Sequence, residues 1–225
     1  MDVAVVTVGD ELLAGETENT NASWLGRRLA DRGATVRRMV VVPDERAVIA
    51  ETVGDLSASF DAVIVTGGVG PTHDDVTLDG VADAFDLDMT EHPKAVDWFA
   101  NHEEYARQDL VSGTMELPAG ARMIPNDEGV APGAVVENVY VLPGVPSEMR
   151  SMFDRIAGEF DGTPLTTEVV YSDRPESSLV DVITAVDERF DVRVGSYPND
   201  GVRIKVAGVD PEEVAAAADW LRERV

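Results

Sequence analysis

The chain has 225 residues, 44% of them hydrophobic, which is enough to bury one full core and a smaller second one. Its 43 acidic residues outnumber its 18 Lys and Arg, and a formal net charge of -25 argues against nucleic acid and anionic membranes as partners. The absence of cysteine excludes disulfides, thiolate metal sites and a cysteine nucleophile. We expect a cytoplasmic protein, since no apolar run reaches the roughly 20 residues of a membrane span.

The acidic residues are spread through amphipathic segments and do not form a separate tail. A chain with this charge repels itself unless salt screens the carboxylates, so the composition favours adaptation to a salt-rich cytosol. The acidity by itself says little about the reaction.

The first third of the chain alternates strand-like and helix-like segments. Apolar β-branched runs at 3–8, 36–42 and 61–66 predict buried strands. Apolar residues recur at helical spacing over 21–32, and Gly33 is expected to end this helix. The same spacing follows Asp44, which we expect to cap the second helix. This order predicts an α/β fold with a parallel sheet and helices on both faces.

The remainder continues the pattern and then changes. A helix capped by Thr77, a helical stretch at 93–107, short strands at 122–124, 134–137 and 139–142, and a helix from Pro146 to Phe160 are expected to complete the first domain. From residue 166 the pattern is strand, helix, strand, strand, helix, typical of a small α+β module. The polar hinge at 161–164 places the domains at 1–163 and 164–225.

Two polar motifs follow predicted strands directly. Thr66-Gly67-Gly68-Val69-Gly70-Pro71-Thr72 is followed by Asp74-Asp75, and Gly9-Asp10-Glu11-Leu12-Leu13-Ala14-Gly15 is followed by Asn19-Thr20-Asn21. Glycines after a buried strand let backbone N–H groups approach a phosphate, and two carboxylates beside that phosphate require a divalent cation between them. The alternatives are a tight turn with a solvated acidic pair, and an Asp10 and Asn21 that only cap a loop and a helix.

Two weaker motifs, both Gly/Pro loops carrying polar residues, lie at 126–133 and at 142–149. His73, His92 and His102, and the aromatic residues Trp98, Phe99 and Tyr105, are more simply explained as loop, surface or packing residues than as a catalytic or stacking group.

The segments "GDELLAG", "TGGVGPTHDD" and "LPGVPSEM", in this order, resemble the molybdopterin-binding (MoaB/Mog-like) domain, and specifically its CinA-type branch, over about residues 3 to 160. The resemblance implies a three-layer α/β/α fold with a mostly parallel sheet, followed by a small α+β KH-like domain. That second domain shows neither the GXXG loop nor the basic surface of a nucleic-acid-binding KH module.

The resemblance implies that Thr66, Gly67, Gly68, Gly70, Pro71 and Thr72 bind a phosphate, that Asp10, Glu11 and Asn21 complete the pocket, that Asp74 and Asp75 are catalytic, and that Asp10, Asp74 and Asp75 hold a divalent metal. In the family "DTN" is frequent where this chain has Asn19-Thr20-Asn21, which removes one candidate metal contact.

Three functions follow from the resemblance. The first is metal-dependent hydrolysis, with Mg²⁺, Mn²⁺ or Co²⁺, of pyrophosphate-linked nucleotides such as ADP-ribose or FAD. The second is molybdopterin binding in cofactor biosynthesis, and the third is nucleotide sensing without turnover. We expect a homodimer, small-molecule phosphate ligands, no nucleic acid or membrane partner, and no nicotinamide-nucleotide amidase activity.

Overall fold

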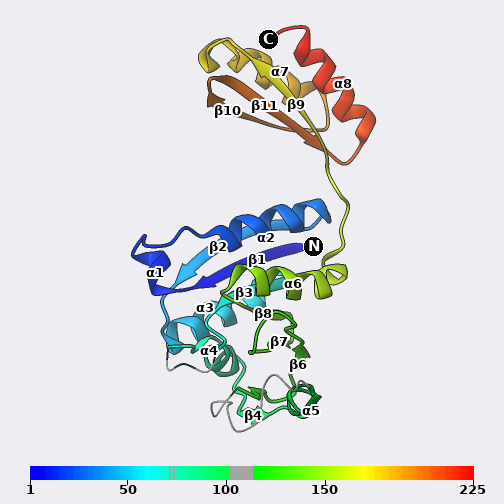
Figure 1. Cartoon of the computed structure of the whole chain (residues 1–225). Coiled ribbons are helices and arrows are strands. Elements are labelled where there is room, and N and C mark those ends of the chain that lie inside the picture. Colours follow the sequence, from blue (N-terminus) through cyan, green and yellow to red (C-terminus); the bar gives the residue numbers. More distant parts are fainter. Residues whose placement is uncertain (71, 73, 102–113) are drawn as a thin grey trace. The chain divides into compact units, whose positions relative to one another are not determined.

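The computed structural model describes residues 1–70, 72, 74–101 and 114–225 (Figure 1). The chain divides into two compact units, Met1–Gly162 and Thr163–Val225, which we describe one at a time. In the described part of the chain no helix is both long and apolar enough to cross a membrane.

The large unit is built on a six-stranded sheet in the order β2-β1-β3-β8-β7-β6. Strands β2, β1, β3 and β8 run parallel, and β7 is antiparallel to both β8 and β6. The strands are β1 (Asp2–Val8), β2 (Thr35–Val42), β3 (Ala62–Gly67), β6 (Arg122–Ile124), β7 (Gly133–Val136) and β8 (Val139–Pro143). The mostly parallel α/β fold expected from the sequence is therefore confirmed.

Helices cover both faces of this sheet. One face packs against α3 (Arg46–Ser59) and α4 (Thr77–Ala84), and the other against α2 (Thr20–Asp31) and α6 (Pro146–Ile156), which continues as the 3₁₀ turn η1 (Ala157–Phe160). The central strands are apolar at nearly every position because their side chains are buried on both faces. Burying each Val contributes roughly 1.5–3 kcal/mol of transfer free energy. This burial holds the central strands, and therefore their carboxyl ends, in fixed positions.

Helix starts were predicted less well than strands. Asp44 does not cap α3, whose N-cap is Glu45, because the Asp44 carboxylate accepts a hydrogen bond from the Asp10 backbone N–H. Thr77 is the first residue of α4 and not its cap. Gly33 closes α2 as predicted, with φ +81°.

Short elements were missed because a single turn or a three-residue strand has no detectable periodicity. These are the one-turn helix α1 (Asp10–Leu13) and the hairpin of β4 (Met89–Glu91) with β5 (Glu116–Pro118). The helix expected at 93–107 is present as α5 (Pro93–Asn101), and its remaining part lies outside the described residues.

The small unit has the expected β-α-β-β-α order. Its sheet, in the order β10-β11-β9, consists of β9 (Thr166–Ser172), β10 (Arg193–Asn199) and β11 (Gly201–Gly208), all antiparallel. The short turn η2 (Glu176–Ser178) precedes α7 (Val180–Arg189), and α8 (Pro211–Arg222) ends the module. Gly201, at φ +91°, makes the tight β10–β11 turn.

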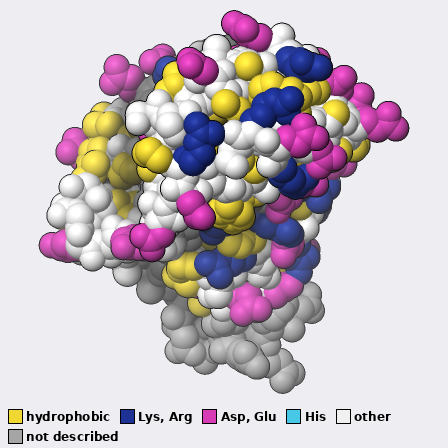
Figure 2. All heavy atoms as spheres, turned by 90° about the horizontal axis from the view of Figure 1, so that it is seen from above, with side chains coloured by type: hydrophobic (Ala, Val, Ile, Leu, Met, Phe, Trp, Pro, Cys, Tyr) yellow, Lys and Arg dark blue, Asp and Glu magenta, His cyan; other side chains and the backbone are white. Residues whose placement is uncertain are grey.

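Charged residues of both signs share the surface. Figure 2 shows one face on which Lys and Arg side chains lie among Asp and Glu side chains. Many charged side chains of the described residues are paired, as in Arg46 with Asp79 and Asp83. Exposed pairs of this kind contribute about 0–1 kcal/mol each, so they moderate the acidic surface more than they hold the fold.

Candidate functional site at the carboxyl edge of the sheet

Three parallel strands end side by side at one edge of the large sheet. β1 ends at Val8, β3 at Gly67 and β8 at Pro143, in adjacent register. Gly67 permits this approach, because a Cβ there would lie 2.6 Å from Val8 Cβ and 2.8 Å from Thr77 Oγ1. In open α/β sheets this carboxyl edge is where ligands bind.

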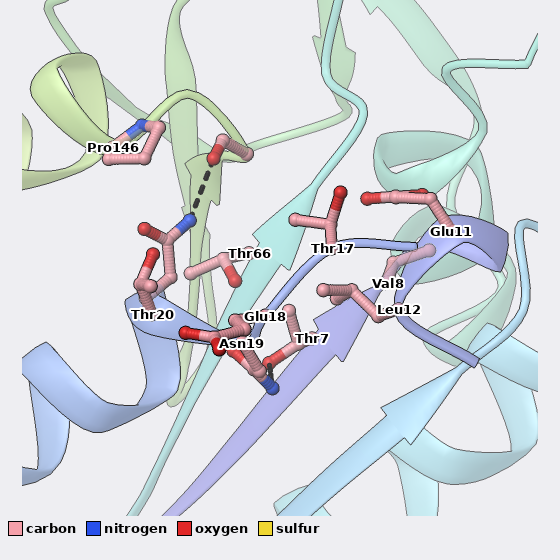
Figure 3. A pocket seen from close by; sticks show the side chains of 12 residues that line it. Thr7, Val8, Glu11, Leu12, Thr17, Glu18, Asn19, Thr20, Thr66 and Pro146 are labelled. Atoms are coloured by element: carbon pink, nitrogen blue, oxygen red, sulfur yellow. Dashed lines mark hydrogen bonds between the residues drawn. The ribbon is translucent and has the colours of Figure 1, made fainter. Parts of the chain in front are cut away.

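A cavity of about 120 Å³ opens at this edge, and we call it the sheet-edge cavity. Figure 3 shows Thr7, Glu18, Asn19 and Thr66 grouped at the strand ends, with α1 on one side and Pro146 of α6 on the other. It is lined by Thr7, Val8, Glu11, Leu12, Thr17, Glu18, Asn19, Thr20, Asn21, Thr66, Gly144 and Pro146. Its lining combines threonines, an amide pair and carboxylates with a few apolar side chains, as small-ligand sites do.

Two buried oxygens, on residues that line this cavity, have no hydrogen-bond partner among the described residues. They are Oγ1 of Thr66, which is 0% exposed, and Oδ1 of Asn21, which is 7% exposed. Asn21 is oriented by its other amide atom, because Nδ2 donates to the Gly144 carbonyl over 2.7 Å (Figure 3). Leaving such a group buried and unpaired costs about 1–3 kcal/mol, so a ligand that donates to it gains affinity.

The neighbouring amide, Asn19, holds the lining in place. Its Oδ1 caps α2 by accepting from the Ala22 backbone N–H, and its Nδ2 donates to Thr7 Oγ1 over 3.1 Å. An aspartate at this position could accept from Ala22 but could not donate to Thr7. The departure from the "DTN" pattern therefore has a structural role here. Glu11 folds back over Gly9, where a Cβ would lie 2.7 Å from its carboxylate.

The backbone at Gly68, Gly70 and Thr72, which we call the glycine cradle, surrounds the Asp75 carboxylate. Asp75 Oδ2 accepts from the Thr72 backbone N–H over 3.0 Å and also from the Thr72 hydroxyl. A Cβ at Gly68 or Gly70 would collide with the same carboxylate. The cradle is thus shaped around an anion, and in this conformation the anion is the chain's own.

Asp75 and the cradle line a second cavity of about 170 Å³. This loop cavity is bounded by Val69, Gly70, Thr72, Asp75, Leu78, Asp79, Met89, Thr114, Glu116 and Pro132. It shares no lining residue with the sheet-edge cavity. The predicted pocket is therefore divided into two neighbouring parts that both begin at the end of β3.

Four carboxylates form an acidic group between α1, the end of β2 and the glycine loop, in which three of them act on the fourth, Asp44. Partial burial raises the pKa of Asp44, and the negative charges of Asp10, Glu11 and Asp74 raise it further, against the opposing effect of the Asp10 backbone N–H. Asp74 thus acts on this acidic group, whereas the carboxylate of its neighbour Asp75 is held in the cradle. Asp44 was missed as a site residue because its position before a helix suggested a cap.

The charge of this group suits a cation, but its geometry is not that of a finished metal site. Among the described residues, no three His, Asp or Glu side chains converge closely enough to hold a metal ion. Repulsion within the group would be relieved by a divalent cation, for which carboxylate oxygens are the preferred ligands.

The two weaker motifs meet each other. Asn126, which is 1% exposed, donates through Nδ2 to the Ala131 carbonyl and to Glu148 Oε2 on α6. The 126–133 loop is thereby fastened to the first turn of α6. This is a packing role, and neither motif contributes a polar side chain to the two cavities.

The predicted site residues are accounted for as follows. Glu11, Asn21 and Thr66 line the sheet-edge cavity, and Gly70, Thr72 and Asp75 line the loop cavity. Gly67 ends β3, Gly68 lies against the Asp75 carboxylate, and Asp10 and Asp74 belong to the acidic group. Pro71, His73, His102 and Tyr105 lie outside the described residues. Trp98 packs against the core, as the packing interpretation expected. Thr7, Thr17 and Glu18 were missed, since isolated hydroxyl and carboxyl residues carry no motif. Thr20 lies within the Asn19-Thr20-Asn21 motif but was not chosen as a site residue.

Known proteins share this organisation. Residues 4–161 match a family model described as a probable molybdopterin binding domain, and residues 164–225 match one described as the middle domain of FAD synthase. A protein of Archaeoglobus fulgidus is 36% identical over 99% of this chain and 97% of its own length.

Relatives in the CinA group are longer or shorter than this chain. A CinA-like protein of Citrifermentans bemidjiense is 32% identical over the whole chain, which spans 58% of that relative's length. The crystal structure of CinA from Thermoplasma acidophilum, whose function is described as unknown, is 33% identical, with a TM-score of 0.66 over 72% of this chain and 100% of that one. The chain therefore belongs to the family of probable molybdopterin-binding domains, in its CinA-like branch.

Proposed function

We propose that this protein binds a phosphorylated nucleotide at the carboxyl edge of the large sheet and hydrolyses its pyrophosphate bond with a divalent metal. The compounds are of the ADP-ribose or FAD class. The observation that carries the proposal is the pair of unpartnered buried oxygens, Thr66 Oγ1 and Asn21 Oδ1, in one cavity beside an anion-shaped cradle.

The sheet-edge cavity suits the sugar or heterocycle of such a ligand. Asn21 Oδ1 can only accept, so it requires an N–H or O–H donor, and Thr66 Oγ1 can accept or donate. Ribose hydroxyls and the amino edges of adenine, flavin or pterin rings all offer such donors. A cavity of about 120 Å³ holds one such moiety and not the whole dinucleotide.

The glycine cradle suits the phosphates. The Thr72 backbone N–H and hydroxyl, which bind Asp75 in the free chain, are the donors that a phosphate oxygen would take over. Asp75 must then turn away from the cradle, which releases its carboxylate for the reaction. The sheet-edge cavity is lined by Thr66 and the loop cavity by Val69 and Gly70, so a ligand that occupied both would have to extend past the end of β3.

The reaction adds one water to a phosphorus atom and breaks its bond to the bridging oxygen. The products are two phosphate monoesters, and the water proton passes to a carboxylate, for which Asp75 and Asp74 are the candidates. A divalent cation held by Asp10, Asp74 and Asp75, with Asp44 beside them, would neutralise phosphate charge that these carboxylates otherwise repel.

The test is a hydrolysis screen of ADP-ribose and FAD with Mg²⁺, Mn²⁺ and Co²⁺, in molar and in dilute KCl. Metal-dependent release of nucleoside monophosphate supports the proposal. Binding of the same compounds without turnover would instead identify a sensor, and retention of molybdopterin with no nucleotide binding would favour cofactor biosynthesis, the function suggested by the family description.

The same samples test two further expectations. If the acidic surface is an adaptation to salt, the melting temperature should fall as KCl is lowered, since carboxylate repulsion loses its screening. Light scattering tests the expected homodimer. An unchanged melting temperature or a monomer would remove the corresponding expectation without affecting the hydrolysis proposal.

A further inference from the structure

The three-stranded sheet of the small unit has one covered and one uncovered face. Val170, Val202, Ile204 and Val206 point toward α7 and α8 and are buried, forming this unit's own core. The opposite side chains have no covering element within this unit, since both of its helices pack on the first side (Figure 1). We call this second side the open sheet face.

Strand register places the residues of the open sheet face. Tyr197 pairs with Arg203 and Arg203 with Tyr171, so the three lie in one row across the sheet. Lys205 lies in the next row and Arg193 in the row beyond it. The outward residues of the three strands are Thr167, Val169, Tyr171, Arg193, Gly195, Tyr197, Asn199, Gly201, Arg203, Lys205 and Ala207.

None of these outward residues is acidic, although the chain has 43 Asp and Glu. Arg193, Arg203 and Lys205 form no ion pair with any carboxylate of the described residues, whereas eight other described arginines do. Arg203 and Lys205 therefore carry positive charge without an ion-pair partner among the described residues in a chain of net charge -25, whereas Arg193 lines a cavity to which Asp191, Asp210 and Glu213 also belong. The charge of the open sheet face is complementary to an anionic partner.

Two exposed tyrosines accompany these charges. Tyr171 is 74% exposed and Tyr197 47% exposed, and the Arg203 guanidinium lies 4.9 Å from the centre of the Tyr197 ring. Exposed aromatic rings on a sheet, with cations between them, are the elements on which single-stranded nucleic acids stack their bases and place their phosphates. Arg203 and Lys205 are two residues apart, about 6.8 Å along the strand, so they can contact successive phosphates.

We propose that the open sheet face binds single-stranded nucleic acid, with bases on Tyr171 and Tyr197 and phosphates on Arg193, Arg203 and Lys205. A free nucleotide offers the same chemistry, but the tyrosine row is a flat surface and not the concave pocket that small ligands need. The proposal does not depend on the pyrophosphatase proposal, since the site lies in the other unit. It replaces the expectation of no nucleic-acid partner, which rested on the net charge and on the absence of a GXXG loop and of a basic surface in this segment of the sequence.

The experiment is fluorescence anisotropy of a labelled single-stranded RNA with the full chain, at KCl concentrations where circular dichroism shows it folded. Three phosphate contacts predict a slope of about −2 in log affinity against log salt. Y171A should weaken binding about 10-fold, while Y171F should retain it because the ring remains. R203Q should weaken binding and reduce the slope by about 0.7.

R189Q is the matched control, since it removes the same charge from α7 of the same unit, on the covered side of the sheet. It should leave RNA binding unchanged. Absence of RNA and DNA binding at every salt concentration, equal effects of R189Q and R203Q, or complete competition by AMP would overturn the proposal. So would light scattering showing that R203Q alone separates a dimer, because the face would then join two copies of the chain.

Discussion

The two cavities at the carboxyl edge begin at the same strand end but differ in how their polar groups are satisfied. In the glycine cradle, the Thr72 donors are occupied by Asp75. In the sheet-edge cavity, Thr66 Oγ1 and Asn21 Oδ1 have no partner among the described residues. A satisfied group stabilises the free chain and must be displaced by a ligand, whereas an unsatisfied one costs stability until a ligand arrives. Under the proposed function, the sheet-edge cavity would therefore recognise the ligand, and the glycine cradle with Asp75 would control the charge around its phosphates.

The largest expected effect comes from removing the negative charge of Asp75 from the glycine cradle. D75N removes the carboxylate charge at constant size, so metal-dependent turnover should fall by about 10²-fold or more, roughly 2.7 kcal/mol of barrier. Without metal, the same variant should bind nucleotide more tightly, because the competing anion has left the cradle. Initial rates and calorimetric titration measure the two effects.

Its control is D31N, which changes an exposed carboxylate at the end of α2 and should alter neither quantity. If the double variant D74N/D75N kept both its metal dependence and its rate, the catalytic assignment would be wrong, and a binding protein with the same cradle would remain.

A methyl group in the cradle is expected to have the next largest effect. In G68A the new Cβ meets the Asp75 carboxylate and lies 3.0 Å from Asp75 Cα, so the loop must shift. Overpacking of this kind costs about 1–3 kcal/mol, and we expect ligand affinity to fall about 10-fold. G158A is the matched control, because a Cβ there has nothing within 4 Å. Thermal unfolding and calorimetry should separate the two variants, and equal behaviour would contradict the anion-shaped cradle.

The recognition region gives an effect of opposite sign on stability and binding. T66V removes a buried hydroxyl that has no partner in the described chain, so the free protein should be equally stable or gain up to about 1 kcal/mol. Nucleotide affinity should nevertheless fall about 5-fold, because the hydroxyl bonds to the ligand. T77V removes a similar buried, unpartnered hydroxyl that does not line the sheet-edge cavity. It should leave affinity unchanged, and a T66V variant with normal affinity would exclude Thr66 from recognition.

The smallest effect concerns pH. Burial and neighbouring carboxylates raise the pKa of Asp44 above its unfolded value of about 3.8. A raised carboxyl pKa favours the folded state below the unfolded pKa, and this advantage is lost as pH rises through the folded pKa. D44N should therefore raise the melting temperature slightly at neutral pH, and the difference from wild type should vanish below about pH 4. A D44N melting temperature below that of wild type at neutral pH, with a gap that closed on acidification, would show that Asp44 stabilises the fold as an anion.

Much of the fold follows from local patterns. The buried runs of β1, β3 and β8, the closing Gly33 and the Pro146 helix start all depend on neighbours within a few residues, which a sequence displays directly. The glycine loop was recognisable for the same reason, since its glycines and acids are contiguous. The family resemblance additionally predicted how the strands and helices of the large unit are arranged in three layers.

Tertiary structure decided which of these residues act together. Asp44 and Asp10 are 34 residues apart and Asn21 and Gly144 are 123 apart, so their contacts depend on strand order and not on any local pattern. Likewise Arg193, Arg203 and Tyr171 are dispersed along the chain and are gathered by strand register into one acid-free face that net charge conceals. Sequence by itself determined the elements and the chemical groups available. Packing decided which of these groups find a hydrogen-bond partner and which face solvent, because both depend on which strands lie side by side.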